Sequence, residues 1–406
     1  MIKVISLKSG IKLILDRMDS VKSVSIGIWC NNGSCNENPE EQGISHFIEH
    51  LLFKGTESRS AFQIVQEMDS IGAEINAFTS KQRTCFYAKC IDKQLFRAAD
   101  VLADMIEHPL FDKDEIEREK LVVIEEINMN ADDPDDVALE TFDGIVMEGS
   151  KLSHPVLGTK ELVSGFSRDF IYDYYLNHYT KDKIAVSVAG AFDEDKLVSF
   201  FENRFSNLRD TARCDEDILP VGRIDNVEIV KDIEQAHLVL GLKTVGAADS
   251  RRYHLSLLSM IMGGGMSSRL FQNVREKKGL AYSVYSSNSF YGNTGEFGIV
   301  AGVAKDRVDE AIAAIKDEID ILDKNPISVE EYESAKCQLT SSYIFSLENT
   351  QSRMRTNGIN YFALGKPVDL DEIVDRINSI TLEDLEKSKK LISDFSKYTI
   401  VNVTGK

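Results

Sequence analysis

The sequence has little basic charge and no long apolar run. Its 406 residues include 47 Lys and Arg against 66 Asp and Glu, a formal net charge of −19. A surface that binds phosphates needs clustered basic residues, so we expect no nucleic-acid partner. No apolar stretch approaches the roughly 18 residues that a membrane helix requires, so we expect no membrane partner either.

Two further signals are missing. Residues 1–8 alternate between apolar and polar side chains, as a strand does, and they lack the apolar core of a signal peptide, which favours a cytoplasmic location. No CxxC pair occurs among the six cysteines, so we interpret them as reduced structural thiols; they are Cys30, Cys35, Cys85, Cys90, Cys214 and Cys337. The acidity suits cationic peptide substrates, but it equally suits plain solubility.

Histidine is also scarce, with seven residues in the chain, yet two of them stand together as His46-Phe47-Ile48-Glu49-His50. Residues i and i+4 share one face of a helix, so both imidazoles can reach one metal ion. The order H-x-x-E-H is the inverted form of the zinc-protease motif. Two surface histidines are the alternative, but the apolar flanks indicate a buried helix, in which unused histidines would be costly; they are Ile44, Phe47, Ile48, Leu51, Leu52 and Phe53.

A catalytic zinc ion needs a third protein ligand, and an acidic helix predicted at 114–128 offers one. At about 100° per residue, the apolar stripe of this helix has Glu119 and Glu126 together about 60–80° to one side, whereas Glu125 falls about 180° away. Geometry therefore favours Glu126, supported by Glu119, as the inward carboxylate. The alternative is that all three are solvated charges, as most glutamates are. The stripe consists of Ile116, Val123 and Ile127.

These residues resemble the pitrilysin, insulysin and mitochondrial processing peptidase superfamily of inverted-motif zinc peptidases. The resemblance implies one Zn²⁺ per subunit, bound by His46, His50 and Glu126, with Glu49 as the general base. It also implies that Glu119 is a supporting acidic residue near the metal. The resemblance covers essentially the whole chain.

The segment Gly72–Ser80 looks like the edge strand with which this superfamily pairs its substrate. Asn76 and Ala77 would then bind an extended peptide through unpaired backbone groups, by strand addition. On sequence alone the segment would simply be another strand. Binding of this kind selects short or unfolded peptides.

In the second half, Arg275 and Tyr282 match the arginine–tyrosine pair of the superfamily, and the glycine run Gly263–Gly265 fits its processing-peptidase branch. The resemblance implies that Arg275 holds the substrate backbone and that Tyr282 stabilises the oxyanion. Long relatives close two such halves around the substrate like a clamshell. We therefore expect a homodimer in which Arg275 and Tyr282 of one subunit act at the zinc of the other.

The length predicts two domains. We place a catalytic zinc-binding domain at 1–208, a polar linker at 209–222 and a metal-free domain at 223–406. The halves look alike, because Asp114–Lys120 resembles Glu330–Lys336. At that spacing Glu119 corresponds to Ala335 and Glu126 to Ser342, so the second copy has no metal ligands.

Each half shows helices and hairpin-like strand pairs, such as Ala73–Phe78 with Thr84–Cys90. This predicts an α+β fold of two homologous domains, each with a mixed, mainly antiparallel sheet packed with helices. The expected function is a zinc metalloendopeptidase. The alternatives are a catalytically silent scaffold subunit and a peptide-binding module of the same fold.

Overall fold

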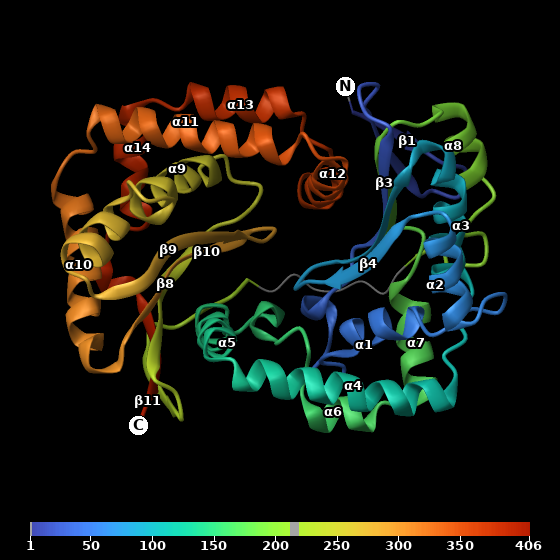
Figure 1. Ribbon diagram of the computed structural model, residues 1–406, viewed down its shortest axis with the longest axis horizontal. Coiled ribbons are helices and arrows are strands. Elements are labelled where there is room, and N and C mark those ends of the chain that lie inside the picture. The colour runs from blue at the N-terminus through green and yellow to red at the C-terminus, as the bar shows by residue number, and fades with distance from the viewer. Residues whose placement is uncertain (1, 212–218) are drawn as a thin grey trace. The chain divides into compact units, whose positions relative to one another are not determined.

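Two β-sheets organise the protein, and each forms the centre of one unit of packed residues (Figure 1). The computed structural model describes residues 2–211 and 219–406. The first unit comprises described residues of 1–128, 154–217 and 346–369, and the second those of 129–153, 218–345 and 370–406. Part of the predicted linker, residues 212–218, lies outside the described residues, as does Cys214.

The first sheet has six strands in the order β1-β2-β6-β3-β5-β4. β2 and β6 pair in parallel, and every other neighbouring pair is antiparallel. β6 is buried at all seven positions and lies inside the sheet, whereas β4 pairs with β5 alone and forms an edge. The strands are β1 Lys3–Ser6, β2 Lys12–Arg17, β3 Ser23–Cys30, β4 Glu74–Thr79, β5 Thr84–Ile91 and β6 Ile184–Gly190.

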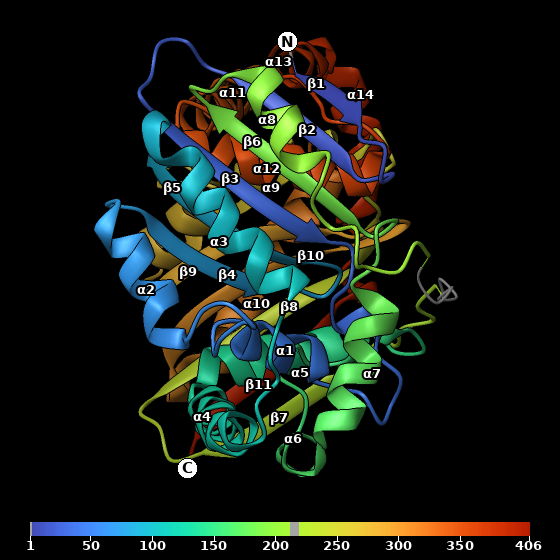
Figure 2. The same cartoon turned by 90° about the vertical axis from the view of Figure 1, so that its right-hand side faces the viewer.

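Helices cover both faces of this sheet. Figures 1 and 2 show α2, α3 and α8 on one face, with α12 on the other. The core on the side of α3 is continuous and apolar, and it includes the buried helix α1. The helices of the first unit are α1 Ile44–Leu52, α2 Ala61–Ser70, α3 Leu95–Glu107, α6 Lys160–Gly165, α7 Arg168–His178, α8 Glu194–Phe201, α12 Thr350–Leu364 and most of α4 Lys113–Asp132.

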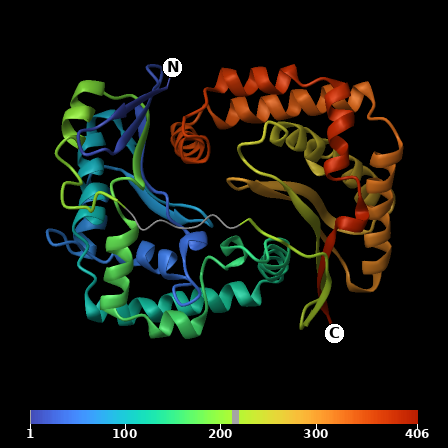
Figure 3. The same ribbon diagram turned by 180° about the vertical axis from the view of Figure 1, so that it is seen from behind.

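The second sheet repeats the first without its β1 strand. Its order is β7-β11-β8-β10-β9, and again one pair, β7 with β11, is parallel. In Figure 3, α5 lies on one face of this sheet and α10 on the other. The strands are β7 Asn226–Lys231, β8 Gln235–Val245, β9 Ala281–Phe290, β10 Thr294–Ala304 and β11 Thr399–Gly405. The helices are α5 Pro134–Val146, α9 Arg252–Gly263, α10 Val308–Lys324, α11 Val329–Ser346, α13 Leu370–Ser379 and α14 Leu382–Ser388. These sheets confirm the predicted α+β class with two similar halves.

One helix from each half of the sequence packs on the sheet formed by the other half, although the predicted division at 209–222 assigns each helix to its own half. α12, from the second half of the sequence, packs on β3 and β6 of the first unit, and α5, from the first half, packs on β8 and β11 of the second. The close approach of α12 needs a glycine, because a Cβ on Gly358 would lie 2.3 Å from the Trp29 indole. An amphipathic pattern shows which helix face is buried but not which sheet covers it, so the sequence could not reveal the exchange.

Five of the cysteines lie among the described residues, and three of these are buried. Cys30, Cys85 and Cys90 are buried free thiols, and desolvation raises the pKa of Cys30 to about 12. Among the described residues, no helix has the length and apolar character needed to cross a bilayer. The cytoplasmic location stays a prediction.

Candidate metal centre

The helix that carries the histidine motif is rigidly placed at its start. Gly43 precedes α1 with φ of +93°, and a carboxylate from a preceding loop caps the helix. Glu37 Oε2 accepts the N–H of Gly43 at 2.8 Å, and Oε1 accepts the N–H of Ser45 at 2.9 Å. Glu37 is fully buried, and desolvation raises its pKa to about 8. Phe47 and Ile48 are also fully buried, so packing fixes the rotation of α1.

The three predicted ligands meet at one point. The Nε2 atoms of His46 and His50 lie 3.2 Å apart. The Oε2 atom of Glu126, from α4, lies 3.7 Å from His46 Nε2 and 3.4 Å from His50 Nε2. Among the described residues these three form the one group of His, Cys, Asp or Glu that could hold a metal ion.

These separations fit a zinc ion. Ligands at about 2.0–2.1 Å in a tetrahedron stand about 3.3–3.4 Å apart, and the three measured distances scatter about that value. Two nitrogens and one oxygen are also the donor set of hydrolytic zinc sites that keep an open position. The residues present therefore fit the metal that the sequence predicts.

The protonation preferences of the two histidines differ. Burial, followed by the nearby charge of His50, lowers the pKa of His46 to about 4, so its ring is neutral and can offer a lone pair. Burial acts in the same direction on His50, but hydrogen bonds with Glu119 and Glu126 outweigh it and raise the pKa of His50 to about 9. The hydrogen bond with His50 in turn lowers the pKa of Glu126. Metal ligation needs neutral imidazoles, so binding must release the proton of His50.

Glu119 lies behind His50 rather than beside the metal position. Its Oε1 is 2.8 Å from His50 Nδ1, and its side chain is 4% exposed. A carboxylate on the other ring nitrogen is the usual second partner of a metal-binding histidine, and it fixes the ring orientation. His46 Nδ1 is buried and has no hydrogen-bond partner among the described residues.

The motif glutamate is placed to handle a proton. Glu49 is half-buried, and Thr79 of the edge strand β4 donates its hydroxyl to Glu49 Oε2 at 2.5 Å. Desolvation raises the pKa of Glu49, and this outweighs the Thr79 hydrogen bond. Oε1 is left to take up a proton.

Three glutamates of α4 differ in exposure in the order that the helical period predicts. Glu119 is buried, Glu126 is 39% exposed at its side chain, and Glu125 is exposed and accepts a hydrogen bond from Asn128. The helix thus turns its two predicted inward carboxylates toward α1.

The predicted substrate-binding residues lie where the sequence places them, although their roles stay predictions. Asn76 and Ala77 lie on the edge strand β4, and Asn76 Oδ1 accepts the N–H of Ala77 at 2.8 Å. In the second unit, Arg275 lies in a π-helical turn, Phe271–Lys277, with its guanidinium 4.6 Å from the Phe271 ring centroid. Tyr282 is the second residue of β9 and is 63% exposed.

Sequence reasoning missed three supporting residues. Each contacts a different part of the site. Glu37 caps α1, Thr79 donates a hydrogen bond to Glu49, and Lys54 pairs with Glu119 at 2.6 Å. Helical spacing gave no signal for Lys54, because α1 ends at Leu52 and Lys54 lies in the turn that follows.

The comparisons with known proteins agree with this geometry. Residues 12–160 match the insulinase family, peptidase family M16, and residues 165–339 match the peptidase M16 inactive domain. The chain is 40% identical to the uncharacterized zinc protease YmxG of Bacillus subtilis, over 100% of this chain and 99% of the relative. It is 37% identical to an uncharacterized zinc protease of Rickettsia felis, covering 97% and 96% of the two chains.

Solved structures show the same fold. A peptidase M16 inactive domain from Pseudomonas fluorescens superposes with a TM-score of 0.92 at 18% identity, over 100% of this chain and 98% of the other. A protease from Helicobacter pylori gives 0.89 at 20% identity, over 100% and 99%. The family models and the curated relatives together define the class of the chain, a family of peptidases. The chain belongs to peptidase family M16, which confirms the resemblance to the pitrilysin superfamily.

Proposed function

We propose that the protein is a zinc metalloendopeptidase that hydrolyses short or unfolded peptides in extended conformation. The observation that carries the proposal is the approach of His46, His50 and Glu126 to tetrahedral spacing. The names of the relatives, zinc proteases that are described as uncharacterized, support the same class.

His46, His50 and Glu126 would hold the zinc ion, one per subunit. Zinc held by three protein ligands supplies Lewis acidity and promotes ionisation of water at its open position. Glu49 then accepts the proton of the attacking water at Oε1, while Thr79 keeps Oε2 in place. Water oxygen bonds to the peptide carbonyl carbon, the C–N bond breaks, and Glu49 returns the proton to the leaving nitrogen. A raised pKa suits a carboxylate that must hold this proton between the two steps.

The edge strand β4 would bind the substrate. Its outer side has no strand partner among the described residues, so an extended peptide can add to it. Asn76 and Ala77 would contact the peptide there, next to Thr79 and hence next to Glu49. Such pairing reads the backbone, which fits a preference for unfolded chains.

We also propose a homodimer in which Arg275 and Tyr282 of one subunit complete the active site of the other. Arg275 would hold the substrate backbone, and Tyr282 would stabilise the oxyanion. The exposure of Tyr282 supports its availability to substrate. The clamshell chamber of long relatives would then be formed by two chains.

Mass spectrometry of an unstructured basic peptide tests the activity. Wild type and Glu49→Gln are incubated with the peptide, with and without a zinc chelator. We expect cleavage by wild type only, abolished by chelation and restored by zinc. The loss in Glu49→Gln should be about 10²–10⁴-fold, the usual contribution of a general base, at unchanged zinc content. Zinc-loaded, folded wild type that cleaves nothing would favour the silent scaffold or the peptide-binding module.

Subunit mixing tests the dimer separately. Glu49→Gln and Tyr282→Phe are each inactive in this account, but a hybrid dimer contains one intact site. Mixing the two variants should therefore restore part of the activity. If mass spectrometry confirms exchange of subunits and no activity returns, the site is not shared between chains.

A further inference from the structure

Glu119 is held at both of its carboxylate oxygens. Oε1 is 2.8 Å from His50 Nδ1, and Oε2 is 2.6 Å from Lys54 Nζ. The carboxylate is 4% exposed, while the side chains of His50 and Lys54 are 22% and 32% exposed. Two contacts therefore connect Lys54 through Glu119 to a predicted metal ligand, His50.

The position of Lys54 is itself fixed by the end of α1. The N–H of Phe53 donates to His50 O at 3.2 Å, and the N–H of Lys54 donates to Leu51 O at 3.0 Å. Gly55 follows with φ of +125°, a conformation that favours glycine. The chain thus turns sharply just beyond Lys54.

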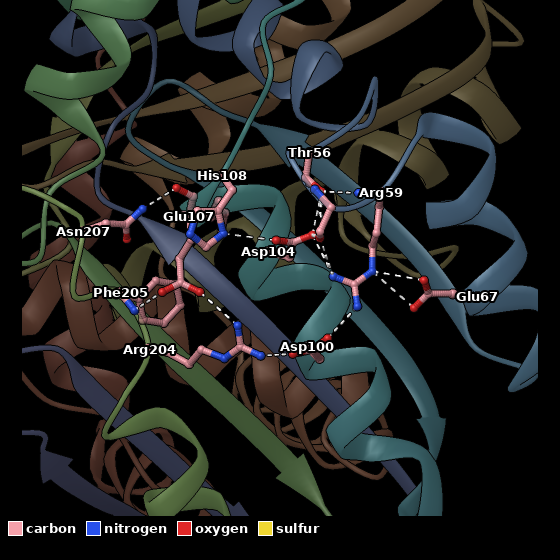
Figure 4. Close-up of polar contacts among 12 residues, drawn as sticks. Thr56, Arg59, Glu67, Asp100, Asp104, Glu107, His108, Arg204, Phe205 and Asn207 are labelled. Atoms are coloured by element: carbon pink, nitrogen blue, oxygen red, sulfur yellow. Dashed lines mark hydrogen bonds and ion pairs between the residues drawn. The ribbon is translucent and has the colours of Figure 1, made fainter.

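A buried polar cluster fastens the loop beyond this turn to α3 (Figure 4). Asp104 Oδ2 accepts from Thr56 Oγ1 at 2.6 Å, from Ser58 Oγ at 2.7 Å and from Arg59 Nη1 at 2.7 Å. Arg59 also donates to Asp100 at 2.6 Å. The Asp104 side chain is 6% exposed, so these bonds are shielded from water. The loop that carries Lys54 is therefore attached both to α1 and to α3.

The second contact of Glu119 has a specific consequence. A carboxylate anchored through one oxygen can pivot about that bond, whereas anchoring through both oxygens fixes its plane. Without Lys54, Oε2 would be a buried acceptor with no partner, which is costly. Glu119 would then turn toward another donor and leave His50 Nδ1.

We infer that Lys54 is a positioning residue for the metal centre, which acts through Glu119 on the ring orientation and tautomer of His50. Lys54 contacts neither the metal position nor the substrate in this account. The inference rests on the proposed function only in that it requires His50 to bind zinc. It is separate from any role in peptide hydrolysis.

Zinc affinity of the full-length protein, measured by competition with a chromophoric chelator, tests this inference. Lys54→Met removes the charge at similar length, and Lys54→Arg keeps it. Lys3→Met is the matched control, because Lys3 forms an ion pair of the same 2.6 Å length with Glu194 at an exposed place in the first unit. Circular dichroism without metal confirms that each variant folds, and Lys54→Gln replaces the methionine variant if that one does not.

We expect Lys54→Met to lose about 10–100-fold in zinc affinity, the usual cost of removing an outer-sphere partner. Lys54→Arg should recover most of the affinity, and Lys3→Met should match wild type. Because Lys54 acts through Glu119, the double variant Lys54→Met with Glu119→Gln should lose no more than Glu119→Gln alone. The ¹⁵N chemical shifts of His50 should report mixed tautomers in Lys54→Met.

Two results would overturn the inference. One is an affinity of Lys54→Met within twofold of wild type. The other is a double variant whose loss equals the product of the two single losses, which would mean that the residues act independently. A wild-type protein that binds no zinc would instead overturn the proposed metal site, and this inference with it.

Discussion

The two sheets share an order of strands, but among the described residues only the first unit has a group of side chains that could hold a metal ion. β2-β6-β3-β5-β4 in the first unit corresponds to β7-β11-β8-β10-β9 in the second. The acidic helix α4 corresponds to α11, in which the positions of Glu119 and Glu126 are occupied by Ala335 and Ser342. The same backbone therefore carries a group of side chains that could hold a metal ion in one copy, whereas in the other copy Ala335 is buried and Ser342 is exposed.

The helix that would carry the histidines differs as well. α9 follows β8 as α1 follows β3, but α9 has one histidine, His254, whose Nδ1 lies 2.6 Å from Ser388 Oγ. At the start of α9 the Asp249 carboxylate accepts one N–H, that of Arg251, whereas Glu37 accepts two at the start of α1. The two units therefore share a backbone arrangement, and a few side chains decide which of them can bind a metal ion.

Replacing one histidine by alanine in each unit should give the largest difference between the units, a difference in zinc binding. His50→Ala removes one of three ligands and the contact that holds Glu119, so we expect no zinc bound at micromolar concentration. His254→Ala removes a hydrogen bond with Ser388 only and should leave zinc binding unchanged. Isothermal titration calorimetry measures both variants. Equal zinc binding by His50→Ala and wild type would remove the distinction between the units.

The cap of α1 should give the first unit a pH dependence through Glu37, whose pKa is raised, whereas the pKa of Asp249 at the start of α9 is lowered. Glu37 has a folded pKa of about 8 against 4.5 ordinarily, so the folded protein holds a proton that the unfolded chain releases. This contribution to the free energy of unfolding is fully present below about pH 4.5 and is lost as pH rises through 8.

Denaturant unfolding of metal-free wild type and Glu37→Gln at pH 5 and pH 8.5 measures the effect. Relative to Glu37→Gln, wild type should lose on the order of 2–4 kcal/mol between the two values. Parallel pH profiles for the two proteins would show that Glu37 does not titrate in this way.

The smallest difference between the units should be in how α12 and α5 pack, because a glycine substitution where either helix packs should lower the stability by a similar amount. A Cβ on Gly358 of α12 would lie 2.3 Å from the Trp29 indole, and one on Gly241 of β8 would lie 2.3 Å from the carbonyl oxygen of Phe297 in β10 and 2.6 Å from the Phe142 ring of α5. Gly358→Ala and Gly241→Ala should each destabilise by about 1–3 kcal/mol, the usual cost of overpacking. Thermal unfolding measures both, and an unaffected protein in either case would show that the helix there packs loosely.

Several parts of this structure could be predicted because the signal is local. The motif at His46–His50 and the helical count that selects Glu126 over Glu125 both depend on side-chain period alone, whereas the edge strand at Asn76 is implied by the resemblance to a known family. Contacts between distant segments could not be predicted. Lys54 meets Glu119, and α12 covers β3, only because the tertiary fold brings them together, and no periodicity in the sequence encodes those pairings.

Anomalous diffraction at the zinc edge, on crystals of the zinc-loaded protein, tests the central claim most directly. We expect one strong peak per chain, about 2.0–2.2 Å from His46 Nε2, His50 Nε2 and a Glu126 carboxylate oxygen, with none in the second unit. A peak away from these three residues, or none from zinc-loaded protein, would contradict it.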